Sequence, residues 1–108
     1  MRPEYLQVMV TVSTHVLDGA AGGPCVGLAV TLETLEGRTV GSGSTDDAGR
    51  IAELGRDLAT GRYRLRWALG DHRPLLREVA IVVELAEDRH YHLPLLAAGA
   101  SAVTYLGV

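Results

Sequence analysis

The sequence has little of several residue types, and each shortage narrows the possible structures. It contains no Phe and one Trp in 108 residues, so the core must be built mainly from Val, Leu and Ala. The single cysteine, Cys25, cannot form an internal disulfide. Cys25 follows Pro24 in a Gly-rich turn. No residue near it in sequence would activate a thiolate, so we expect a small, inert side chain.

The sequence also lacks large clusters of positive charge and long hydrophobic runs. Lysine is absent, the net charge is −3 and the arginines are scattered, which disfavours nucleic acid and anionic membranes as partners. The longest apolar run is far too short to span a membrane, and the first residues do not resemble a signal peptide. We therefore expect a cytoplasmic protein with no membrane partner, forming a single domain over residues 1–108.

Alternating apolar and polar residues predict a series of short strands. The strictest alternation follows Gly61, where an aromatic and aliphatic face opposes a row of three arginines that is most simply a solvated outer face. Residues 78–85 are apolar on nearly both faces, which predicts a central strand. Seven or eight such strands separated by turns predict an all-β fold, an antiparallel sandwich with little or no helix.

Histidines occupy the polar faces of two of these predicted strands. In residues 89–96, Tyr91, Leu93 and Leu95 share an apolar face fit for a core, and His90 and His92 lie on the opposite face. Near the N-terminus, His15 continues the polar face of a strand whose other face is valine. Arg50 follows an Asp-rich turn and, taken alone, is typical of a solvated turn residue.

These residues by themselves leave several functions open. Imidazoles that titrate near neutral pH together with a guanidinium suit hydrolysis, as acid–base groups and oxyanion stabiliser. Two histidines at i and i+2, with His15 as a third ligand, can also hold a metal ion. The simplest alternative is that His90 and His92 only hydrogen-bond backbone groups at an interface.

Three motifs in order resemble the 5-hydroxyisourate hydrolases of the transthyretin-like family. They are Ser13-Thr14-His15-Val16-Leu17-Asp18, Asp47-Ala48-Gly49-Arg50 and His90-Tyr91-His92-Leu93-Pro94-Leu95-Leu96, and together they cover nearly the whole chain. The resemblance implies a two-sheet sandwich that dimerises edge to edge. Two dimers would then form a homotetramer around a central channel that holds the active sites.

The resemblance also implies a function and a set of site residues. The implied activity is the ring opening of a cyclic amide in purine (urate) catabolism, on 5-hydroxyisourate or a related ring, without cofactor or metal. The implied catalytic residues are His15, Arg50 and His92. The implied substrate-binding residues are His90, Tyr105, Leu106 and Val108. In the hormone-binding transthyretins the position of His92 is not histidine, so this residue favours the enzymes.

Two departures from the family pattern favour a diverged member. The C-terminal Tyr-Arg-Gly-Ser signature is Tyr105-Leu106-Gly107-Val108 here, which would make one end of the substrate site apolar. The connection between Leu69 and Glu78 is also shorter than is usual in the family. An apolar channel suits hydrophobic ligands, so a non-catalytic small-ligand carrier of the transthyretin type is the alternative.

Overall fold

The computed structural model describes residues 9–70 and 75–107, and these residues form ten strands and no α-helix. The strands are β1 (Val10–Asp18), β2 (Gly23–Pro24), β3 (Ala29–Thr34), β4 (Thr39–Ser44), β5 (Arg50–Leu58), β6 (Gly61–Ala68), β7 (Glu78–Leu85), β8 (His90–His92), β9 (Leu95–Ala98) and β10 (Ser101–Thr104). No helix in these two ranges could cross a membrane.

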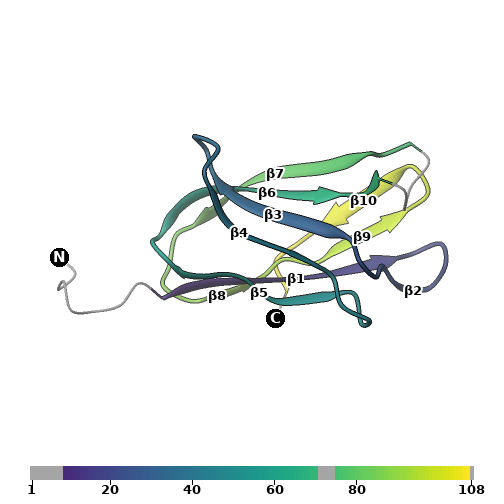
Figure 1. Ribbon diagram of the computed structural model, residues 1–108, viewed down its shortest axis with the longest axis horizontal. Coiled ribbons are helices and arrows are strands. Elements are labelled where there is room, and N and C mark those ends of the chain that lie inside the picture. Colours follow the sequence, from purple (N-terminus) through teal and green to yellow (C-terminus); the bar gives the residue numbers. More distant parts are fainter. Residues whose placement is uncertain (1–8, 71–74, 108) are drawn as a thin grey trace.

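Two sheets pack face to face, with β3, β6 and β7 in one layer and β1, β5 and β8 in the other (Figure 1). The smaller sheet has the order β4-β3-β6-β7 and is antiparallel throughout. In the larger sheet, of order β10-β9-β1-β2, β5 and β8 also pair with β1. The predicted all-β sandwich is confirmed.

The pairing of β1 was not anticipated, because two of its neighbours run parallel to it. Thr11 lies opposite His90 and Ser13 opposite His92, and the same parallel alignment continues from β1 into β9. After β7 the chain crosses from the smaller sheet to the larger one and follows β1 in the same direction. The predicted strand over 89–96 is thereby divided into β8 and β9, which are separated by Leu93 and Pro94.

The prediction that residues 78–85 form a central strand is wrong. Among the described strands, β7 lies at an edge of the smaller sheet and pairs only with β6. Its outward face remains uncovered, and Val82 is 56% exposed. The apolar pattern of residues 78–85 indicated that both faces of the strand would be buried. In the described structure, the outward face of β7 and the edge away from β6 are left open.

The core joins the two sheets through one buried polar chain. The indole nitrogen of Trp67, on β6, donates to the hydroxyl of Thr14 on β1 at 3.1 Å, and that hydroxyl donates to the carbonyl oxygen of Leu93 at 2.7 Å. Trp67 is fully buried and Thr14 is nearly so. A buried indole N–H needs an acceptor, so these contacts fix how β1, β6 and the end of β8 align.

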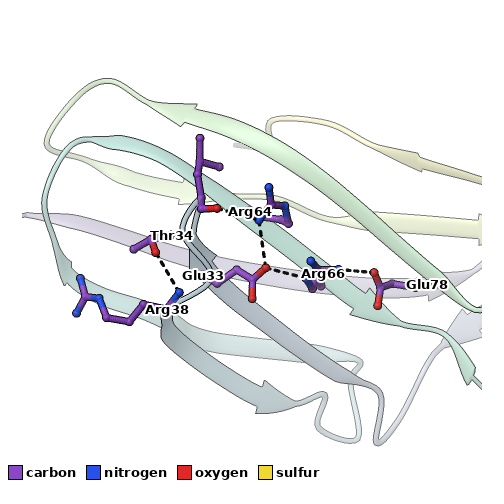
Figure 2. Close-up of polar contacts among 7 residues, drawn as sticks. Glu33, Thr34, Arg38, Arg64, Arg66 and Glu78 are labelled. Atoms are coloured by element: carbon purple, nitrogen blue, oxygen red, sulfur yellow. Dashed lines mark hydrogen bonds and ion pairs between the residues drawn. The ribbon is translucent and has the colours of Figure 1, made fainter.

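The arginine row on β6 forms an ion-pair ladder over the outer face of the smaller sheet. Figure 2 shows Glu33 of β3 beside Arg64 and Arg66, with Arg66 reaching Glu78 on the other side. The shortest contacts are 2.8 Å from Arg66 Nε to Glu33 and 2.6 Å from Arg66 Nη1 to Glu78. These arginines lie on an outer face, as expected, and are neutralised across neighbouring strands.

Candidate functional site

The outward face of β1 is the platform of the candidate site. Side chains alternate along a strand, so Thr11, Ser13 and His15 share the face opposite the buried valines. On one side β1 pairs with β5, and on the other with β8 (Figure 1). The three sequence motifs, distant along the chain, are thereby brought onto one sheet face.

His15 lies directly opposite Arg50 in the β1–β5 pair. The turn before β5 is organised by Asp46, whose Oδ1 accepts the backbone N–H groups of Ala48 and Arg50, each at 2.9 Å. These bonds, that of Arg50 first, hold the pKa of the Asp46 carboxyl below its ordinary value. The predicted tight turn is confirmed, and it opens directly into a strand that carries Arg50.

Glycine is required at position 49 in this turn. Its φ of +77° is strained for other residues, and an added Cβ would lie 2.6 Å from the carbonyl oxygen of Val16 and 2.9 Å from Cβ of Pro24. The turn can therefore pack closely against β1. That approach brings the carbonyl oxygen of Ala48 to 2.8 Å from Nε2 of His15.

The contact with Ala48 determines which nitrogen of His15 carries a proton. A carbonyl oxygen only accepts, so Nε2 of His15 must be the N–H donor. In the neutral ring the lone pair is then on Nδ1. The guanidinium of Arg50 makes no hydrogen bond or ion pair with other residues in 9–70 or 75–107, and its side chain is exposed. It is available to an electron-rich ligand.

His90 and His92 are linked to β1 through hydroxyl groups. Ser13 Oγ lies 2.7 Å from Nδ1 of His92 and 2.8 Å from Nε2 of His90. The hydroxyl of Thr11 lies 2.6 Å from Nδ1 of His90. Both nitrogens of His90 are thus engaged, whereas Nε2 of His92 has no hydrogen bond within the part of the chain that the structure describes.

Burial and nearby cations shape the chemistry of His92. Partial burial lowers the pKa of His92 below its ordinary value, and the positive charges of His15, His90 and Arg50 lower it further. Its neutral form is therefore favoured near neutral pH, with a ring nitrogen that can take up a proton. His92 consequently has the properties of a general base in this site.

The C-terminal segment closes over His92 through Gly107. In Figure 1 the chain after β10 descends to the sheet that contains β1, and the N–H of Gly107 donates to the carbonyl oxygen of His92 at 2.7 Å. An added Cβ at Gly107 would lie 2.7 Å from Cδ2 of His92, so only glycine packs here without displacement. Tyr105 and Leu106 are each more than half exposed. Val108 lies outside the described residues.

The described residues do not form an evident metal site. No group of three or more His, Cys, Asp or Glu side chains within 9–70 and 75–107 is arranged to hold a metal ion. One ring nitrogen of His90 and one of His92 are both occupied by the Ser13 hydroxyl. The function without metal stays a prediction.

Four groups in the site were not predicted as functional residues: Thr11, Ser13, the Ala48 carbonyl and Gly107. Strand phase did place Thr11 and Ser13 on the face of His15. The missing information was which strand lies beside β1, since parallel pairing with β8 is what brings the hydroxyls to the imidazoles. Ala48 acts through its backbone carbonyl, and Gly107 acts through its backbone N–H and its close packing on His92. The only sequence signal for these two contacts is the presence of a glycine at position 107.

Fold and site together define a two-sheet β-sandwich with an imidazole and guanidinium site on the outer face of one sheet. Comparison with known proteins agrees with this class. Residues 12–107 match the HIUase/Transthyretin family. The chain belongs to this family.

Similar proteins include two 5-hydroxyisourate hydrolases and a transthyretin. The 5-hydroxyisourate hydrolase of Caulobacter vibrioides is 35% identical over 114 residues, covering 92% of this chain and 99% of that protein. The structure of Klebsiella pneumoniae 5-hydroxyisourate hydrolase is 36% identical with a TM-score of 0.84, covering 93% of this chain and 100% of that one. Sea bream transthyretin in complex with thyroxine has a TM-score of 0.80, covering 91% and 95%; at 24% identity it shows the shared fold alone.

The electrostatics of His92 give a prediction that nuclear magnetic resonance can check. His92 should titrate below the ordinary histidine value of 6.5. The change His15→Gln should raise the pKa of His92, because it removes a nearby positive charge. As the control, Arg38→Gln removes a cation at the exposed β3–β4 turn and should leave the titration of His92 unchanged. An unshifted His92 in His15→Gln would contradict the described charge arrangement.

Proposed function

We propose that this protein is a hydrolase that opens a cyclic amide ring, with 5-hydroxyisourate or a related ring as substrate. The observation that carries the proposal is the unengaged Nε2 of His92. The other ring nitrogen, Nδ1, is bonded to Ser13, and the ring lies close to the charges of His15 and Arg50. The hydrolase names of the relatives from Caulobacter and Klebsiella support it. The proposal includes purine catabolism in the cytoplasm as the setting.

In the proposed reaction, His92 acts as the general base. Its Nε2 takes a proton from water, and the oxygen of that water forms a bond to the ring carbonyl carbon. The carbonyl oxygen becomes an oxyanion, which the guanidinium of Arg50 stabilises. The C–N bond of the ring then breaks, and the leaving nitrogen receives a proton from an imidazolium. That imidazolium is His92, and His15, held by Ala48, is the second acid–base group, whose Nδ1 is the nitrogen left to exchange a proton.

The carrier alternative is favoured by an apolar row next to this site. Leu17, Leu96 and Val103 lie in register on β1, β9 and β10, and Leu96 and Val103 are 41% and 56% exposed. Leu17 is two residues beyond His15 on the same face. A carrier would bind an apolar ligand there without turnover, so an assay on freshly made 5-hydroxyisourate separates the two functions.

The first prediction from the proposal concerns the two histidines of β8. His92→Asn should lower turnover by ~10²–10⁴-fold, the usual contribution of a general acid–base group. His90→Asn should lower it less, because both nitrogens of His90 are already bonded to β1 and the ring is not left with a nitrogen for substrate. Steady-state kinetics on both variants measure the ranking. A greater loss in His90→Asn would show that the roles are assigned wrongly.

The second prediction concerns the C-terminal segment. The aliphatic Leu106 and Val108 cannot hydrogen-bond a polar ring, whose groups would stay unpaired. We expect 5-hydroxyisourate to be a poor substrate, with kcat/KM below ~10⁴ M⁻¹s⁻¹, the lower end of the range usual for enzymes. The double change Leu106→Arg with Val108→Ser should raise kcat/KM, whereas Leu35→Arg, at an exposed leucine in the β3–β4 turn, should not. If the double change has no effect, the segment does not determine the substrate.

The third prediction is the oligomeric state. We propose a homotetramer, supported by two separate apolar surfaces: the open edge and outer face of β7, and the row Leu17, Leu96 and Val103. Light scattering should give a mass of four chains at micromolar concentration, and a monomer would contradict the proposal. Val103→Asp should reduce the mass, while Val26→Asp, at an exposed valine in the loop between β2 and β3, should preserve it.

A further inference from the structure

Ser13 connects two imidazoles through a single hydroxyl group. Its side chain is 8% exposed, and its Oγ lies within hydrogen-bond distance of His92 Nδ1 and His90 Nε2. His90 Nδ1 in turn contacts the Thr11 hydroxyl at 2.6 Å. Four side chains on two parallel strands thus form one continuous chain, Thr11–His90–Ser13–His92, that ends at the unengaged Nε2 of His92.

Hydrogen-bond chemistry restricts the states of this chain. A serine hydroxyl has one proton, so it can donate to only one of the two rings. Two rings that both presented a lone pair to Ser13 would leave one contact without a proton. Two rings that both donated would leave the Ser13 proton without an acceptor among the described contacts. When Ser13 donates to one neutral ring, the other satisfies the chain by donating to Ser13.

The two directions of donation correspond to two tautomer pairs. In the first, His92 Nδ1–H donates to Ser13, Ser13 donates to His90 Nε2, and His90 Nδ1–H donates to Thr11. Both rings then carry the proton on Nδ1, and His92 Nε2 is a base. In the second, every bond is reversed, both rings carry the proton on Nε2, and His92 Nε2–H is a hydrogen-bond donor.

We propose that Ser13 is a positioning residue that couples the tautomers of His92 and His90, and that the chain relays a proton from His92 to His90. This role rests on the proposed hydrolase. When His92 Nε2 takes a proton from water, Nδ1 gives its proton to Ser13 Oγ, and Ser13 gives its own to His90 Nε2. The positive charge then lies on His90, while His92 and Ser13 stay neutral.

The surroundings favour movement of charge in this direction. His92 is half-buried and has His15 and Arg50 near it, which penalise a second positive charge. His90 is exposed, so water can hydrate the imidazolium there. The reverse transfer returns a proton to His92 Nδ1 and lets Nε2 protonate the leaving nitrogen. One chain can thus serve both halves of a hydrolysis.

The tautomers can be measured without substrate. In protein labelled with ¹⁵N-histidine, long-range ¹H–¹⁵N spectra above the titration range identify the protonated nitrogen of each ring. We expect His90 and His92 to share one tautomer, both Nδ1–H or both Nε2–H. A protein in which one ring is Nδ1–H and the other Nε2–H would overturn the coupling, and this measurement needs no variant.

A double-variant cycle isolates the hydroxyl. His90→Gln should change the ¹⁵N shifts of His92 in the natural background and in Ser13→Thr, which keeps a hydroxyl, but not in the Ser13→Ala background. Ser42→Ala, an exposed serine on β4 of the other sheet, is the matched control and should leave both rings unchanged. An equal response with and without the Ser13 hydroxyl would overturn the proposal.

Kinetics separate this proposal from the hydrolase itself. Ser13→Ala should lower kcat by roughly 10–100-fold, as loss of an orienting partner of a histidine does elsewhere, with KM little changed and Ser13→Thr restoring the rate. If the protein hydrolyses 5-hydroxyisourate but the tautomers of His90 and His92 are independent, the relay is overturned and the hydrolase is not. Coupled tautomers without turnover of 5-hydroxyisourate would support the coupling and overturn 5-hydroxyisourate as the substrate.

Discussion

The parallel alignment of β8 with β1 is the constraint on which the candidate site depends. A slip of one residue would turn His90 and His92 into the core and expose Tyr91, because successive side chains point to opposite faces. The core prevents that slip. Leu93 N–H donates to Ser13 O, and the Thr14 hydroxyl holds the Leu93 carbonyl while it accepts from Trp67. The positions of the imidazoles are thus fixed by buried contacts on the opposite face of the same strands.

Local burial patterns predicted which faces of the strands are inward, but could not identify neighbouring strands. Tyr91, Leu93 and Leu95 were expected on one inward face, and all three are buried. The strand over 78–85 was misplaced because an apolar outer face has the same sequence pattern whether it is covered or, as for β7 here, left open. Parallel pairing was also beyond prediction, since it depends on how the chain crosses between the sheets after β7.

In the candidate site, the sequence likewise predicted the reactive side chains but not the groups that orient them. Motifs indicated His15, Arg50 and His92, and the structure places them on one sheet face. The groups that orient them were not foreseen, because their chemistry is ordinary. Ser13 is one hydroxyl among many, and the Ala48 carbonyl exists in every residue. They become specific only through position, at 2.7 Å from His92 and 2.8 Å from His15.

The arginines on the two sheets differ in whether a carboxylate neutralises them, and this difference bears on function. On the outer face of the smaller sheet, Arg64 and Arg66 share Glu33, so their charges are largely neutralised. On the larger sheet, Asp46 is the acid near Arg50, and its Oδ1 is occupied by two backbone N–H groups. A carboxylate bonded to the site would stabilise a charged imidazolium and neutralise Arg50. Without one among the described contacts, the neutral imidazole is favoured and the guanidinium can attract an oxyanion.

That arrangement creates a requirement which the hydroxyl chain can meet. A base surrounded by positive charge takes up a proton readily only if the new charge does not stay beside Arg50. Proton transfer through Ser13 moves the charge to the exposed ring of His90, where solvent stabilises it. The same parallel register that sets His92 opposite Ser13 sets His90 opposite Thr11. The geometry that supplies the base therefore also supplies the place to which its proton can go.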